Sequence, residues 1–166
     1  MPRTPTTAPR GARSPTRAID RRDTYAAPTV EQLDAPKGRL YPPGAMLIAS
    51  PLAVDALVRR VPRGRVVTLG ALRATLAAAH GADYTCPMTT GIFLRIVAEA
   101  AEEERTLGAR TVTPWWRVVR DTGALLDRLP GGVTRQRALL EAEGVTMRAG
   151  REPMIAVVSE VAFDPS

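Results

Sequence analysis

Between residues 50 and 143, four segments have apolar positions at the three- and four-residue spacing of a helix. Ser50 and Thr68 can cap the first two helices with a side-chain oxygen, and Pro87 opens the third. The fourth spans Val133–Glu143 and stops before Gly144. The positions expected to face the core are Val54, Leu57, Val58, Val61, Leu69, Leu72, Leu76, Ala79, Ile92, Phe93, Ile96, Val97, Ala100, Leu139 and Leu140.

The second and third predicted helices are joined by a short connection that contains Gly81, a pattern typical of a helix-turn-helix. A plain packed helical hairpin has the same spacing, so the pattern alone leaves both open. The face of the third helix opposite its apolar stripe carries Met88, Gly91, Arg95 and Glu102. Gly91 lets a partner approach the helix axis and Arg95 supplies a forked cation beside it, which favours a DNA-reading helix.

Between residues 111 and 132 the helical period gives way to β-type residues and turns. Thr111–Val119 is predicted to be a strand around two tryptophans, and Arg120–Gly123 a turn. Leu125–Gly132 then returns irregularly, as in a small β wing. A weak alternation over Met154–Phe163 predicts a terminal strand. The predicted fold class is therefore mainly α with a small β wing, a winged helix-turn-helix.

Residues 1–45 differ from the rest in composition. They contain eight prolines, and six arginines lie between Arg3 and Arg22. Such a segment buries too little apolar surface to offset its ordering entropy, so we expect a disordered basic arm at 1–45 and a compact domain at 46–166. The arm is either a solvated leader or mis-assigned start, or a segment that adds non-specific affinity for nucleic acid.

The chain carries 23 Lys and Arg against 17 Asp and Glu, a formal charge of +6, and +4 of it lies before residue 46. A single cysteine, Cys86, and a single histidine, His80, exclude an intramolecular disulfide and the usual zinc sites, so we expect no metal and no cofactor. No apolar run is long enough to span a bilayer and no secretory signal opens the chain. We therefore expect a cytoplasmic protein.

Three linked motifs, spread over residues 51 to 145, resemble the DNA-binding domain of the 6-O-alkylguanine-DNA alkyltransferases. The segment Val61–Thr68 is similar to the start of that domain, and Pro114–Val119, PWWRVV, resembles the family's Pro-Cys-His-Arg-Val-Val active-site motif. Gly131–Gly144 then matches the Gly-Gly, Leu-Leu and Glu-Gly pattern of the helix that follows. The order and spacing of all three agree with the family.

The resemblance implies a winged helix-turn-helix that docks in the minor groove and flips an alkylated guanine into a pocket. In the family a thiolate accepts the alkyl group, and an adjacent histidine, assisted by a glutamate, removes the thiol proton. Trp115 stands at the acceptor position, Trp116 at the histidine position, and Glu143 matches the glutamate. Tryptophan at the acceptor position marks the alkyltransferase-like proteins, which bind 6-O-alkylguanine without repairing it. Those proteins keep the histidine, which this chain lacks.

The resemblance also implies residue roles. Met88 stands where the family has the arginine that replaces the flipped base, and can act as an apolar wedge between base pairs. Trp115 is expected to stack on the extruded base, Leu69 replaces a tyrosine, and Pro130 replaces a serine that offers an N–H. The backbone carbonyls of Trp115 and Val118 remain available for base recognition. The residues expected to contact DNA or the lesion are Thr68, Tyr84, Met88, Gly91, Arg95, Pro114, Trp115, Trp116, Arg117, Val118 and Pro130.

A carboxylate triplet, Glu102 to Glu104, ends the predicted recognition helix. Phosphate would repel it, so it is expected to point away from DNA. We interpret it as a solvated face in preference to a docking site for a repair partner.

These observations predict a non-enzymatic, monomeric protein that binds damaged double-stranded DNA at the nucleoid and signals to excision-repair proteins. One alternative is a winged-helix regulator or architectural protein without lesion specificity. The other is an enzyme in which Cys86, at the start of the recognition helix, has become the alkyl acceptor. A small buried thiol explains Cys86 more simply, because no general base other than His80 is available to it.

Overall fold

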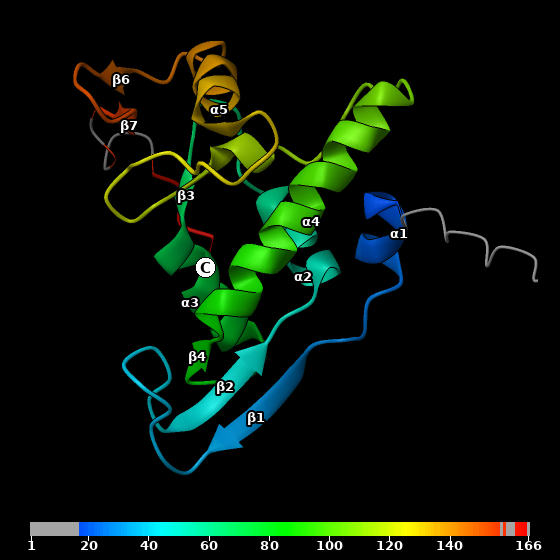
Figure 1. Ribbon diagram of the computed structural model, residues 1–166, viewed down its shortest axis with the longest axis vertical. Helices are drawn as coiled ribbons and strands as arrows, with labels where there is room; N and C mark the ends of the chain where they lie inside the picture. Colours follow the sequence, from blue (N-terminus) through cyan, green and yellow to red (C-terminus); the bar gives the residue numbers. More distant parts are fainter. Residues whose placement is uncertain (1–16, 157, 159–161, 166) are drawn as a thin grey trace, which may run out of the picture.

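The structure, a computed structural model, describes residues 17–156, 158 and 162–165. It confirms the mainly α class with small β elements (Figure 1). The helices are α1 (Ala18–Asp23), α2 (Pro51–Val58), α3 (Leu69–Ala79), α4 (Pro87–Thr106), η1 (Trp115–Arg117, a 3-10 turn) and α5 (Gly132–Glu141). The strands are β1 (Thr29–Leu33), β2 (Gly44–Ile48), β3 (Val67–Thr68), β4 (Tyr84–Thr85), β5 (Val118–Val119), β6 (Met147–Arg148) and β7 (Met154–Ile155).

The helix-turn-helix forms from the capping residues that the sequence indicates. The Ser50 hydroxyl accepts a hydrogen bond from the Ala53 amide, and the Thr68 hydroxyl accepts one from the Ala71 amide, each at 3.2 Å. These bonds satisfy amides that a helix N-terminus leaves without a partner. Pro87 begins α4, which runs to Thr106, two residues beyond the carboxylate triplet at its predicted end. Figure 1 shows α4 as a long diagonal helix, and both α1 and α2 pack against it.

The main core lies between α2, α3, α4 and η1, and contains most of the side chains predicted to face inward. Phe93, Leu72 and Val97 are almost completely buried there. Two predicted core positions are wrong: Ala79, the last residue of α3, is exposed, and Ile92 is 52% exposed. Ile92 lies on the same exposed side of α4 as Met88 and Arg95, at a spacing of three or four residues.

The part of the predicted arm that the structure describes, 17–45, is ordered, so the prediction of disorder is wrong there. The Glu103 carboxylate accepts hydrogen bonds from the Ala18 and Ile19 amides, at 2.8 and 3.1 Å, and so holds the start of α1 against α4. β1 pairs antiparallel with β2, from Thr29 opposite Ile48 to Leu33 opposite Gly44. The rest of the predicted arm, 1–16, lies outside the described residues.

The predicted strand Thr111–Val119 is also wrong for most of its length, because Pro114 is followed by η1 and only Val118 and Val119 pair, parallel to β3. Pro114 has no amide hydrogen to give to a strand ladder. The predicted turn and irregular return are present, with a β-bridge from Ala124 to Met154. β7 covers only the first two residues of the predicted terminal strand, part of which lies outside the described residues. Within the described chain no helix has the length and apolarity to cross a membrane.

Candidate nucleic-acid interface

The N-terminal half of α4 presents an exposed face, as the spacing predicts. Met88 is 62% exposed, and Gly91 and Arg95 are exposed beside it. A Cβ added at Gly91 would meet no atom within 4 Å apart from its chain neighbours and its own helix backbone, so this glycine is not required by packing against other elements. It leaves the helix backbone open to a partner. The fourth residue predicted on this face, Glu102, is only half-exposed, and its carboxylate binds Trp115 and Arg135 inside the protein.

A cavity of about 500 Å³ lies between this face and the loop that follows β5. Three arginines and one carboxylate contribute to a wall that is otherwise apolar or glycine. The described residues that line it are Leu69, Met88, Gly91, Ile92, Leu94, Arg95, Arg120, Leu126, Asp127, Arg128 and Leu129. None of these is a cysteine, histidine or serine, so this wall offers cationic and apolar contacts and one carboxylate, Asp127, but no thiol or imidazole.

The arginines of the cavity differ in how far their charges are compensated. Arg95 donates to Glu99 at 2.8 Å, and Glu99 also pairs with Arg21 of α1. Burial raises the pKa of Glu99, but the hydrogen bonds from Arg21 and Arg95 outweigh burial and leave it below its usual range. Arg120 lies 3.5 Å from Asp127, at an exposed site. Exposed pairs of this kind exchange readily for phosphate.

Trp115 is fully buried and is not among the residues that line the cavity. Its indole N–H donates to Glu102 at 3.0 Å. It belongs to the same hydrophobic cluster as Leu94, Leu126 and Leu129, which do line the cavity. Trp115 is therefore part of the core that supports the cavity wall.

Trp116 is half-buried, and its ring packs edge-on against Trp115 at 6.0 Å between centroids. Its indole N–H donates to Glu143 at 2.9 Å, and Arg117 forms a 2.7 Å ion pair with the same carboxylate. Burial raises the pKa of Glu143, but the hydrogen bonds from Arg117, the Gly64 amide and Trp116 outweigh it and hold that pKa below its usual range. Arg117, predicted to contact DNA, is thus paired inside the protein.

The carboxylate triplet is not a solvated face, contrary to the sequence interpretation. Glu102 accepts hydrogen bonds from Trp115, Arg105 and Arg135, and so joins α4 to η1 and α5. Glu103 caps α1, and Glu104 pairs with the buried Arg22 at 2.7 Å. Each carboxylate has an internal partner, and apart from Arg105 these partners lie at least 13 residues away along the chain, so the sequence does not reveal them.

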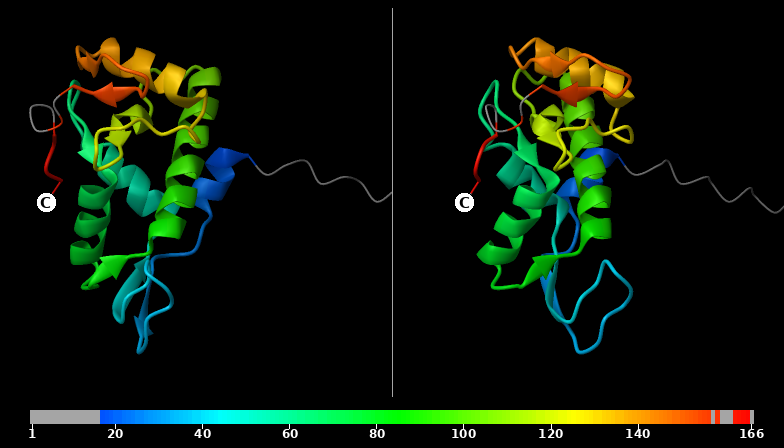
Figure 2. Two further views of the ribbon diagram at one scale, coloured as in Figure 1. Left: turned by 60° about the vertical axis from the view of Figure 1, so that its left-hand side comes forward. Right: turned by 90° about the vertical axis from the view of Figure 1, so that its left-hand side faces the viewer.

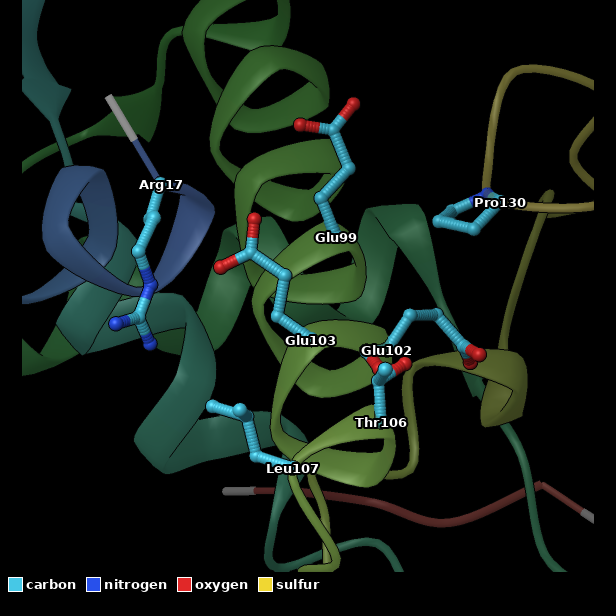
Figure 3. Close-up of a pocket in the computed structure, with 7 residues that line it drawn as sticks. All are labelled: Arg17, Glu99, Glu102, Glu103, Thr106, Leu107 and Pro130. Atoms are coloured by element: carbon cyan, nitrogen blue, oxygen red, sulfur yellow. The ribbon is translucent and has the colours of Figure 1, made fainter. Parts of the chain in front are cut away.

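Pro130 lies on the other side of the loop, at a second cavity of about 640 Å³. Figure 3 shows Pro130 across from Glu99 and Glu102, with Arg17 and Glu103 on the opposite side. Three carboxylates contribute to this cavity, and such a lining disfavours phosphate. The structure therefore places Pro130 apart from the cavity beside Met88.

The remaining predicted site residues have structural partners. The Val118 carbonyl accepts a hydrogen bond from Gln136 at 2.7 Å, and the Trp115 carbonyl accepts one from the Val118 amide. Pro114 is buried, and Thr68 caps α3. Tyr84 donates its hydroxyl hydrogen to the Pro42 carbonyl at 2.8 Å.

Gln136 is a site-shaping residue that the sequence interpretation missed. It is fully buried in α5, its amide oxygen accepts from the Leu126 amide at 2.7 Å, and its amide nitrogen donates to the Trp116 and Val118 carbonyls. It therefore fixes the start of the cavity loop on β5. Its spacing from Leu140, four residues away on the inward face of α5, is the signal that indicates burial.

Comparison with known proteins gives a family and two solved structures. The sequence profile described as 6-O-methylguanine DNA methyltransferase, DNA binding domain, matches residues 51–145. The structure of S. pombe Atl1 in complex with damaged DNA containing O6-carboxymethylguanine is 24% identical, with a TM-score of 0.47 over 68% of this chain and 93% of that chain. A structure of S. pombe ATL in complex with DNA is 23% identical, with a TM-score of 0.46 over the same shares. Curated proteins give no match.

Proposed function

The chain belongs to the family of the 6-O-methylguanine DNA methyltransferase DNA-binding domain, and we propose that it binds alkylated guanine in double-stranded DNA without removing the alkyl group. The observation that carries this proposal is the cavity of about 500 Å³ beside the exposed face of α4. Its arginines suit phosphate and its leucines suit a base taken out of the stack.

Docking of α4 in the minor groove would bring Met88 to the base stack. Met88 is exposed at the cavity rim and acts as the wedge that takes the place of the extruded base. Extrusion costs a few kcal/mol, less for a weakly paired lesion, and apolar contacts in the cavity offset part of it. The base lies against the leucine wall, and Trp115 supports that wall from the core.

Absence of alkyl transfer follows from the side chains at the positions of the family motif. Transfer needs a thiolate and a base to form it, and Trp115 and Trp116 supply neither. Both indole N–H groups donate to carboxylates. A lesion that is bound and left in place needs other proteins to remove it, so excision-repair proteins are the proposed partners.

The test is a titration of two end-labelled duplexes that differ only in one 6-O-methylguanine, followed by fluorescence anisotropy. The expected result is a lower Kd for the damaged duplex. Equal Kd values would support the alternative of a winged-helix DNA-binding protein without lesion specificity.

An alkyl-acceptor role for Cys86 is tested by intact mass after incubation with the damaged duplex. Cys86 is 3% exposed and lines a different hollow, on the β1–β2 side of Met88. We expect an unchanged mass. A gain of one methyl group that is lost in Cys86→Ala would show that the protein is an enzyme.

A further inference from the structure

We propose that residues 34–43, the loop between β1 and β2, form a second DNA-contacting element beside α4. We call this segment the hairpin loop. It precedes residues 51–145, the part of the chain that matches the family profile. The proposal rests on the proposed function, because it extends the DNA surface of α4, and its test separates the two.

The hairpin loop and α4 line one hollow of about 350 Å³, to which the loop contributes Lys37 and Tyr41 and α4 contributes Met88 and Thr89. Met88 also lines the larger cavity on its other side. The proposed wedge therefore stands between the hairpin loop and the loop after β5. In the right-hand view of Figure 2, these two loops project to the same side of α4.

Short contacts fix the hairpin loop relative to the start of α4. β2 pairs in parallel with β4, which ends two residues before α4 begins. The Tyr84 hydroxyl donates to the Pro42 carbonyl at 2.8 Å, and the Ala45 amide donates to Asp83 at 2.7 Å. Within the loop, the Lys37 amide donates to the Tyr41 carbonyl at 2.9 Å. DNA that docks on α4 would thus meet the loop at a defined place.

The exposed side chains of the hairpin loop suit DNA. Lys37 and Arg39 are exposed, against one carboxylate, Asp34. Among the described residues neither cation has an ion-pair partner, whereas Arg95 on α4 is paired with Glu99. Free cations neutralise phosphates and fix the register of a protein on the duplex.

Leu40 adds apolar surface to the same loop. It is 65% exposed, close to the value for Met88, and lies between Arg39 and Tyr41. Proteins that bind the minor groove combine cations with exposed apolar side chains in this way. We therefore expect the hairpin loop to contact the minor groove on one side of the lesion.

The test compares the salt dependence of Kd for the wild type, Lys37→Ala/Arg39→Ala, and a matched control, Arg110→Ala/Arg137→Ala. The control removes the same charge beyond the end of α4 and from α5, at the end of the molecule opposite the hairpin (Figure 1). The association constant K falls as salt rises, and loss of two phosphate contacts makes the negative slope of log K against log salt less steep by about 1 to 2. We expect this change for damaged and undamaged duplexes alike, with the ratio of their Kd values unchanged and the control at the wild-type slope.

Hydroxyl-radical footprints locate the contact, and Arg39→Gln, which removes one charge, gives a second variant. The wild type should protect sugars on one side of the lesion that the double variant leaves open. A wild-type slope and footprint in both variants, with lesion preference retained, would overturn the hairpin-loop proposal alone. Failure of the wild type to prefer the damaged duplex would instead overturn the proposed function.

Discussion

Two carboxylates accept the indole hydrogen bonds of the adjacent tryptophans. An indole N–H can only donate, so a buried tryptophan needs an acceptor. Glu102 accepts from Trp115 and Glu143 accepts from Trp116. Both indole N–H groups are therefore bound inside the protein, and these two hydrogen bonds connect η1 to α4 and to the segment that follows α5.

Glu143→Gln tests this role through pH. The pKa of Glu143 is lower in the folded chain than its unfolded value of about 4.3, so its contribution to stability is complete above that value and is lost as the pH falls through the folded pKa. At pH 7 the variant should lose about 3 kcal/mol of unfolding free energy, because Arg117 is left without its buried partner. Urea unfolding should show the difference from wild type narrowing below about pH 4.

The matched control is Glu141→Gln, which removes an exposed carboxylate that pairs with Arg137. It should change stability by no more than about 0.5 kcal/mol at either pH. If the difference in unfolding free energy between wild type and Glu143→Gln stays constant down to pH 3, the role assigned to this carboxylate is contradicted.

Met88→Ala tests the wedge. The side chain is exposed in the free protein, so we expect stability to change by less than about 0.5 kcal/mol. Burial of a methionine side chain contributes about 1.5 kcal/mol or more, so Kd for the damaged duplex should rise about tenfold. Leu107→Ala, at the opposite end of α4 and 69% exposed, is the control. Equal losses in the two variants would argue against a specific contact at Met88.

At the scale of elements, the sequence was most informative where local signals determine the structure. Ser50, Thr68 and Pro87 begin their helices as predicted, because caps and proline act within one turn. α1 has only six residues and no apolar stripe, and its start depends on Glu103, 85 residues away. β1 is exposed at four of its five positions, so no alternation marks it.

Spacing likewise predicted which face of α4 is exposed, but not which side chains are already engaged. Met88, Gly91 and Arg95 lie on the predicted surface. Arg117 is instead paired inside the protein with Glu143, 26 residues away. A single sequence carries no signal for such long-range partners.

Removal of the cap on α1 tests the dependence of this helix on α4. Glu103→Ala leaves the Ala18 and Ile19 amides without their acceptor, which typically costs about 1 kcal/mol. Hydrogen exchange should accelerate at the amides of α1 while those of α3 keep their wild-type rates. Glu31→Ala, at an exposed position of β1, should leave both unchanged. Unaltered protection of α1 in Glu103→Ala would show that other contacts hold it.

At the scale of the whole molecule, the two halves of α4 adjoin cavities of opposite charge. Its N-terminal half adjoins a cavity with three arginines, and its C-terminal half adjoins a cavity with three glutamates. DNA is therefore expected to approach the N-terminal half, where both the loop after β5 and the hairpin loop lie. The acidic half binds the protein's own amides, arginines and tryptophan.

The most direct test of binding without repair is recovery of DNA by the immobilised protein from an equal mixture of duplexes with and without 6-O-methylguanine. The bound DNA is digested to nucleosides and its 6-O-methylguanine measured by mass spectrometry. The predicted result is enrichment of the damaged duplex with its methyl groups intact. Equal recovery of the two duplexes, or guanine in place of the 6-O-methylguanine in the bound fraction, would contradict the account.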